Sequence, residues 1–266
     1  NNEKPAAPKP KSVSSSGERG SVQRLVLWSI ALSGFVAMLY EVAWTRLLAM
    51  VLGSSSHGFS VMLITFISGI AVGAWLIGRW REIENPVRLF ARLEILVGVT
   101  IFISLFTFEY LPFWFVHLAN LLNRTPDAYP LYHVVQASIC FLVMFVPTVC
   151  LGMTLPLVSR IATDEVAKTG RSVGLVFSVN TIGTVLGAAL TGLVLLPTLG
   201  LSRVFGLGIA INVAIGIVIL IRGSEQSRRF AMIGLPLLII GIVSFTGGRF
   251  GNAWQRVLTQ GLWRRA

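Results

Sequence analysis

The sequence predicts an all-α membrane protein, a bundle of about seven transmembrane helices with its N-terminus in the cytoplasm and its C-terminus outside. Only 12% of its 266 residues are charged, whereas a soluble domain carries about a quarter charged residues. Seven apolar stretches follow one another along the chain, each close to the ~20 residues that cross ~30 Å of hydrocarbon. Because lipid offers backbone groups no partners, every stretch is expected to be a helix.

The predicted bundle, residues 22–247, lies between two tails. Residues 1–21 alternate proline with lysine before a serine run, which predicts a disordered basic cytoplasmic tail. Residues 248–266 place Trp254 and Trp263 among arginines, a mixture that predicts an external tail at the membrane surface. The seven spans are expected at residues 25–52, 59–78, 93–115, 131–158, 173–196, 204–221 and 230–245.

The distribution of lysine and arginine predicts the orientation. Of the 22 basic residues, fifteen fall in segments that are cytoplasmic if the N-terminus is inside, and six fall in external segments or the C-terminal tail. Positive residues are retained on the cytoplasmic side, so this alternation favours an odd number of spans. It also accounts for the net charge of +11, so that no nucleic-acid partner is expected.

The first span contains the most unusual polar run, with Tyr40, Glu41, Trp44 and Arg46 inside apolar sequence. Charged groups at membrane depth cost several kcal/mol unless they are paired or solvated, so they are candidates for function. Five residues at ~100° each separate Glu41 and Arg46 by ~140°, so the two need not pair with each other. Either this run forms a buried polar site, or its aromatic and basic residues anchor the span at the interface.

Two further acids lie in the third span. Glu109 is expected at a depth similar to that of Arg46, and we hypothesise that it neutralises this arginine. Glu94 lies about one turn into the predicted span, beside Arg92, which favours a snorkelling acid at the interface over a ligand.

The fifth and sixth spans contain polar and small residues at depth. Asn180 needs a hydrogen-bond partner, and it either joins helices or lines a cavity, whereas for Asn212 we favour a bond between helices. Gly183 and Gly187 form a small-xxx-small face, which predicts close packing against another helix.

Pro147 and Pro156, nine residues apart in the fourth span, predict a kinked or broken helix. Broken helices border substrate cavities in transporters, but they also occur in ordinary bundles, and both interpretations stay open. The sequence has no metal-ligand cluster, no cofactor fingerprint and no persuasive catalytic set. We therefore expect no metal, no cofactor and no enzymatic activity in this chain.

Several motifs carry a family resemblance: residues 33–35, 40–48 and 53–55, then 68–79, 151–156, 180–183 with Gly187 and Gly192, and 196–200. They resemble the membrane domain of bacterial fused proteins, which join a major-facilitator-like bundle to a spermidine-synthase-like domain. The tail at residues 254–261 is similar to the segment that leads into that second domain. The resemblance implies a multi-pass protein of a bacterial inner membrane, folded like half of a major-facilitator transporter.

The synthase-like part is absent from this sequence, which is therefore expected to be a truncation or a free-standing membrane half. An odd number of spans would also place an appended domain outside the cytoplasm. We predict a non-catalytic membrane subunit that anchors a partner protein or domain in the bilayer, or a homo-oligomer. The alternative is a transporter or binding module for a small cationic, polyamine-like solute, whose path Glu41, Glu109, Asn180 and the fourth span would line.

Overall fold

The computed structural model describes residues 15–51, 56–121, 129–163, 169–221 and 225–251. Within these ranges the fold is all-α, as predicted. The helices are α1 (Ser15–Val51), α2 (Ser56–Arg79), α3 (Pro86–Leu121), α4 (Tyr129–Ala162), α5 (Thr169–Leu190), α6 (Leu196–Leu199), α7 (Leu201–Leu220) and α8 (Glu225–Phe250). A π-helical turn, η3 (Thr191–Leu195), joins α5 to α6 without a break, and Gly200, with φ 77°, separates α6 from α7.

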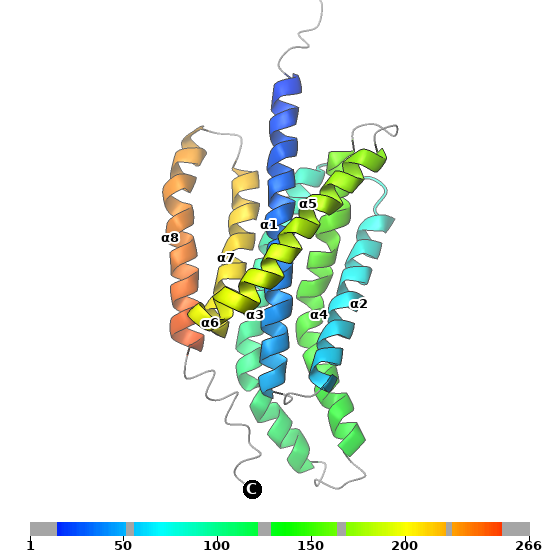
Figure 1. The fold of residues 1–266 in the computed structure, drawn as a ribbon, viewed down its shortest axis with the longest axis vertical. Helices are drawn as coiled ribbons and strands as arrows, with labels where there is room; N and C mark the ends of the chain where they lie inside the picture. The colour runs from blue at the N-terminus through cyan, green and yellow to red at the C-terminus, as the bar shows by residue number, and fades with distance from the viewer. Residues whose placement is uncertain (1–14, 52–55, 122–128, 164–168, 222–224, 252–266) are drawn as a thin grey trace, which may run out of the picture.

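Six of the described helical segments are long and apolar enough to cross a membrane. The prediction of a polytopic bundle is confirmed. The seventh predicted span corresponds to α8, in which the apolar stretch found among the described side chains, Gly234–Phe250, is shorter than the six candidate spans. The described chain begins and ends at opposite ends of the molecule (Figure 1). The side that faces the cytoplasm stays a prediction from the basic residues. Most of the two predicted tails lies outside the described residues, although α1 begins at Ser15.

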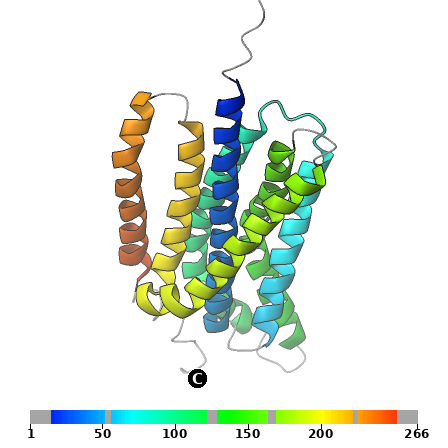
Figure 2. The same cartoon turned by 45° about the horizontal axis from the view of Figure 1, so that its top comes forward.

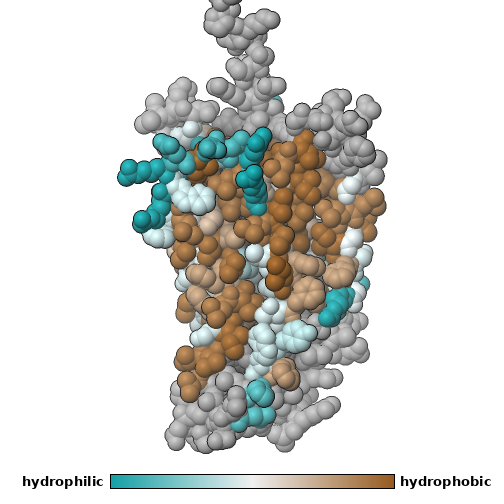
Figure 3. Space-filling model, turned by 180° about the vertical axis from the view of Figure 1, so that it is seen from behind, coloured by the Kyte–Doolittle hydropathy of each residue, from teal (hydrophilic) through white to brown (hydrophobic). Residues whose placement is uncertain are grey.

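The bundle is built around α1, with α3 and α7 packed behind it. The α5 helix crosses α1 obliquely, and α8 lies at the edge against α7 (Figures 1 and 2). The closest pairs are α2 with α4, α1 with α5, and α3 with α7. Seen from behind, hydrophobic side chains cover the middle of the molecule, and the hydrophilic ones gather mostly near the end where α1 starts (Figure 3). This surface suits lipid at mid-height and water near that end.

Glycines let two of these pairs touch backbone to backbone. A Cβ added at Gly152 of α4 would lie 2.5 Å from the Cα of Ile70 in α2, and one added at Gly73 would overlap the backbone oxygen of Val149. In the other pair, a Cβ at Gly183 or Gly187 of α5 would overlap a backbone oxygen of α1. Helices in lipid associate through such close packing, because lipid tails are as apolar as the side chains themselves.

Hydroxyl groups within the spans mostly bond inside their own helix. Thr65 donates to the carbonyl of Val61 at 2.7 Å, Thr148 to that of Phe145 at 2.8 Å, and Thr181 to that of Phe177 at 2.8 Å. The same pattern holds for Thr45, Thr100, Ser138, Thr154, Thr198 and Thr246. These hydroxyls are therefore satisfied without a partner on another helix.

Arg160, near the end of α4, holds the end of α2. Its Nη2 donates to the carbonyl of Ile77 at 2.9 Å, and its Nη1 donates to that of Trp80 at 2.5 Å. The last carbonyls of a helix have no partner within the helix, and they carry the negative end of its dipole. A guanidinium group donates hydrogen bonds to these carbonyls and also supplies the positive charge that the dipole favours.

We expect Arg160→Gln to lower the free energy of unfolding by about 0.5–1.5 kcal/mol, because two hydrogen bonds are lost at an exposed helix end. Arg160→Lys should cost less, since an ammonium group keeps the charge but loses the planar fork. Thermal unfolding in detergent, followed by circular dichroism, measures the effect, with Arg171→Gln as an exposed control. Equal melting temperatures for Arg160→Gln and Arg171→Gln would show that the α2 carbonyls do not depend on Arg160.

Candidate functional site

The third long helix places a carboxyl group in the interior. It begins with Asn85 as its cap, because the side-chain Oδ1 accepts the backbone N–H of Arg88 at 3.1 Å, and Pro86 is its first residue. Glu94 therefore lies eight residues inside the helix, ~12 Å from its start. Its side chain is 0% exposed. The expectation of a snorkelling interfacial acid is wrong.

A hydrogen bond between α1 and α7 lies next to this carboxyl group. The Nδ2 of Asn212 donates to the hydroxyl oxygen of Tyr40 at 3.3 Å, and both residues are fully buried. Gly208, one turn before Asn212, leaves room for the Tyr40 ring, since a Cβ there would lie 2.5 Å from it. The interhelical role predicted for Asn212 is confirmed.

The packing of α3 on α7 brings Asn212 and Glu94 into the same part of the bundle. The two helices run antiparallel, because Gly216 lies against Ala91 and Ile95, whereas Gly98, further along α3, lies against Ile209 and Val213 of α7. Glu94 lies among the α3 residues that meet Gly216, and Asn212 lies among the α7 residues that meet Gly98. The two polar residues are therefore at neighbouring crossings of these helices, about one helical turn apart.

Two hydroxyl groups from α1 complete the set. The Ser33 hydroxyl lies beside the Glu94 carboxyl group, and the Tyr40 hydroxyl is close enough to interact with its charge. Ser33 and Tyr40 are two helical turns apart on one face, and a tyrosine side chain points back toward the start of its helix. The hydroxyl of Tyr40 is thereby directed toward the level of Ser33. We call Ser33, Tyr40, Glu94 and Asn212 the interior polar cluster.

The interior polar cluster has more acceptors than donors. Apart from the Ser33 hydroxyl beside it, the Glu94 carboxyl group has no hydrogen-bond partner among the described residues, and the Oδ1 of Asn212 has none. All three oxygen atoms accept hydrogen bonds. A carboxyl oxygen can donate one only when the carboxyl group is protonated. Buried polar atoms are almost always paired in folded proteins, so this arrangement fits a missing donor, namely a proton or a bound cation with N–H groups.

Apolar side chains close the cluster at both ends. Toward one end, the Tyr40 ring packs on Trp44 and Phe205, with ring centroids 5.8 and 6.2 Å apart, and Phe66 and Phe108 extend this layer. Toward the other end lies a second buried core that includes Val26, Ile30, Phe90, Ile215 and Ile219. The cluster is thus enclosed within the bundle, and a solute reaches it only if the helices move.

The residues that the sequence predicted as a polar site do not all come together. Tyr40 and Trp44 are fully buried, but Glu41 is only half-buried and Arg46 is exposed. The side chain of Glu109 lies outside the described residues, so its predicted pairing with Arg46 stays a hypothesis. Of the residues that were predicted to form a polar site, only Tyr40 belongs to the interior polar cluster. Trp44 belongs to the aromatic layer next to it.

The remaining predicted residues lie at helix crossings. Asn180 is half-buried on α5 and packs against α1, where a Cβ added at Gly34 would lie 2.6 Å from its Oδ1. Pro147 and Pro156 both lie inside α4, which runs through them as one helix from Tyr129 to Ala162. The predicted break is therefore not seen in α4, and a substrate cavity beside these prolines stays a prediction.

Comparison with known proteins finds no relative: no family model, no curated protein and no solved structure matches the chain. The chain is an integral, multi-pass, helical membrane protein. The likeness of its motifs to the membrane domain of fused synthase-like proteins accordingly stays a prediction. Any finer statement of function depends on the interior polar cluster.

Proposed function

We propose that this chain binds a small cationic solute inside its helix bundle, as a transporter or a binding module. The observation that carries the proposal is the fully buried carboxyl group of Glu94, which has no hydrogen-bond partner among the described residues apart from the Ser33 hydroxyl beside it. An ionisable group at membrane depth is costly, and such groups mark ion and substrate paths in membrane proteins. A bound cation offsets that cost, because it supplies both charge and hydrogen-bond donors.

The chemistry of the cluster favours a protonated amine over a bare metal ion. The Glu94 carboxyl group supplies a negative charge and acceptor oxygens, which suit the N–H donors of a primary ammonium group. When the helices move apart to admit a solute, the aromatic layer beside Tyr40 would present ring faces that attract cations. A polyamine-like solute, predicted from the sequence as an alternative, has this combination of groups.

Replacing Glu94 tests the proposal. We expect the chain, reconstituted in lipid nanodiscs, to bind radiolabelled spermidine or putrescine saturably, and Glu94→Gln to weaken that binding at least tenfold. Glutamine keeps the size of the side chain and removes the charge, so the fold should be preserved. Glu41→Gln, on the half-buried acid of α1, is the matched control and should bind as the unaltered chain does.

Circular dichroism and thermal unfolding check that each variant is folded. If Glu94→Gln bound the amine as tightly as the unaltered chain, the interior polar cluster would not be the site. The proposal would also fail if the unaltered chain bound neither amine saturably.

A second candidate role is an anchor for another protein, and the outer face of α5 favours it. Ile182 and Val185 of α5 and Leu193 of η3 are 60%, 62% and 79% exposed, and they form part of an apolar surface along these two segments. A protein partner or a second copy of the chain could cover this face. Gentle purification with identification of what remains bound distinguishes the roles, since a stable protein partner indicates an anchor. In both roles we propose a non-catalytic protein of a bacterial inner membrane.

A further inference from the structure

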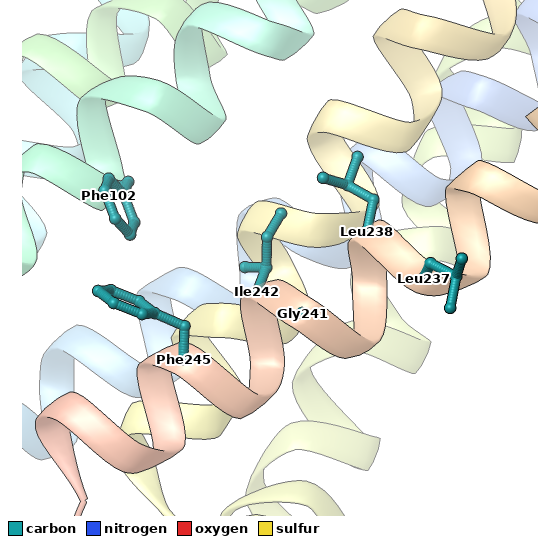
Figure 4. Close-up of a pocket in the computed structure, with 6 residues that line it drawn as sticks. All are labelled: Phe102, Leu237, Leu238, Gly241, Ile242 and Phe245. Carbon is teal, nitrogen blue, oxygen red and sulfur yellow. The ribbon is translucent and has the colours of Figure 1, made fainter.

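A groove between α3 and α8 opens on the apolar surface of the bundle. Its volume is about 390 Å³, and it is lined by Phe102 of α3 and by Leu237, Leu238, Gly241, Ile242 and Phe245 of α8 (Figure 4). Every lining side chain is apolar. The rings of Phe102 and Phe245, whose centroids are 5.9 Å apart, bridge the two helices at one end. Leu237 and Phe245 are 64% and 49% exposed, so the groove faces the surroundings of the bundle.

The groove leads toward a cationic side chain at the end of α8. Residues four apart lie on one helix face, so Gly241, Phe245 and Arg249 follow one another along the groove. The guanidinium carbon of Arg249 is 5.2 Å from the ring centroid of Phe250, and that ring packs against Phe106 of α3 at 5.2 Å. An arginine is thereby held just beyond the apolar lining, on the side of the bundle where α8 ends.

We propose that this groove binds one acyl chain of an anionic phospholipid, whose phosphate lies at Arg249. From Leu237 to Phe245 the groove extends ~12 Å along the helix axis, which is most of the ~15 Å depth of one leaflet. A transmembrane helix, ~10 Å across, is too wide for a space of this size. The positive charge of Arg249, at the end of α8, matches the position of a lipid phosphate above its chain.

Lipid retention measures this site directly. The full chain is reconstituted with equal amounts of phosphatidylglycerol and phosphatidylcholine of the same acyl chains, purified again, and its retained lipids are counted by native mass spectrometry. We expect at least fivefold enrichment of phosphatidylglycerol on the unaltered chain. Arg249→Gln should abolish the enrichment, because the phosphate loses its cation, while lipid of either kind is still retained.

Filling the groove tests the position of the acyl chain. A Cβ added at Gly241 meets nothing within 4 Å, so Gly241→Leu is sterically tolerated and occupies the groove. It should reduce retained lipid to the level of the surrounding bilayer. Gly174→Leu in α5, another exposed glycine with open space around it, is the matched control and should retain lipid as the unaltered chain does.

Equal retention of the two lipids by the unaltered chain would overturn the proposal that the lipid is anionic and that its phosphate lies at Arg249. Unchanged retention by Gly241→Leu would overturn the groove as the site, as would a protein found bound there in place of lipid. If Gly241→Leu does not fold, Arg249→Gln still decides the question, because it alters an exposed residue near the end of α8. None of these outcomes depends on solute binding at Glu94.

Discussion

Replacing Trp44 with alanine is expected to lower the free energy of unfolding by about 3 kcal/mol, the largest effect of any change considered. Its side chain is 0% exposed and lies between Tyr40, Phe66 and Phe205. Little of the cost comes from transfer out of water, because the unfolded helix already lies in lipid. It comes from the cavity that remains, at ~24 cal/mol per Å³, or ~2.4 kcal/mol for each 100 Å³ that the bundle does not refill.

The control for this change lies on the same helix. Trp28 is 73% exposed, and lipid can refill the space that its truncation leaves. We expect Trp28→Ala to alter the free energy of unfolding by no more than about 0.5 kcal/mol, the usual effect of surface changes. Both variants are compared by unfolding in detergent micelles, followed by circular dichroism. Equal losses for the two tryptophans would mean that the aromatic layer is not closely packed.

Gly73→Ala, which adds a single methyl group, should have the second-largest effect on the free energy of unfolding. The added Cβ overlaps the backbone oxygen of Val149, and it would lie 2.9 Å from backbone atoms of Gly152 and Met153. None of these is the flexible end of a side chain, so α2 and α4 must separate. Overpacking of this kind costs about 1–3 kcal/mol, and the loss should reach the upper part of that range because the contact is between backbones.

Gly78→Ala, on the same helix, separates packing from helix propensity. A Cβ added at Gly78 meets nothing within 4 Å. Alanine there should stabilise α2 by up to about 1 kcal/mol, since glycine is the poorer helix former. The two variants are therefore expected to shift the melting temperature in opposite directions. A shift in the same direction for both would contradict the close approach of α2 and α4.

The helical fold was predictable because hydrophobic length is a strong signal. Each predicted span overlaps a helix of the structure, since ~20 apolar residues leave the backbone no other way to satisfy its polar groups in lipid. The last predicted span, residues 230–245, lies wholly within α8. The pairing of the helices was harder to predict from the sequence. In lipid it depends on the matching shapes of two helix surfaces rather than on apolarity.

The interior polar cluster was mostly missed because the start of α3 was placed too late. With the span beginning at residue 93, Glu94 appeared to lie at the membrane boundary. The sequence Asn85-Pro86 held the missing signal, because asparagine caps helices and proline favours the first helical position. A helix that begins at Pro86 places Glu94 two turns inside. Its neighbours on α1 and α7 could not be predicted, because they depend on how three helices cross.

The hydroxyl groups that bond within their own helices make rearrangement of the bundle less costly. When α1 separates from α5, the hydroxyls of Thr45 and Thr181 keep their acceptors, so no orphaned donor is exposed to hydrocarbon. The interface between α1 and α5 then loses mainly van der Waals contacts, which lipid tails partly replace. Separating these two helices therefore costs mainly packing contact and little hydrogen-bond energy.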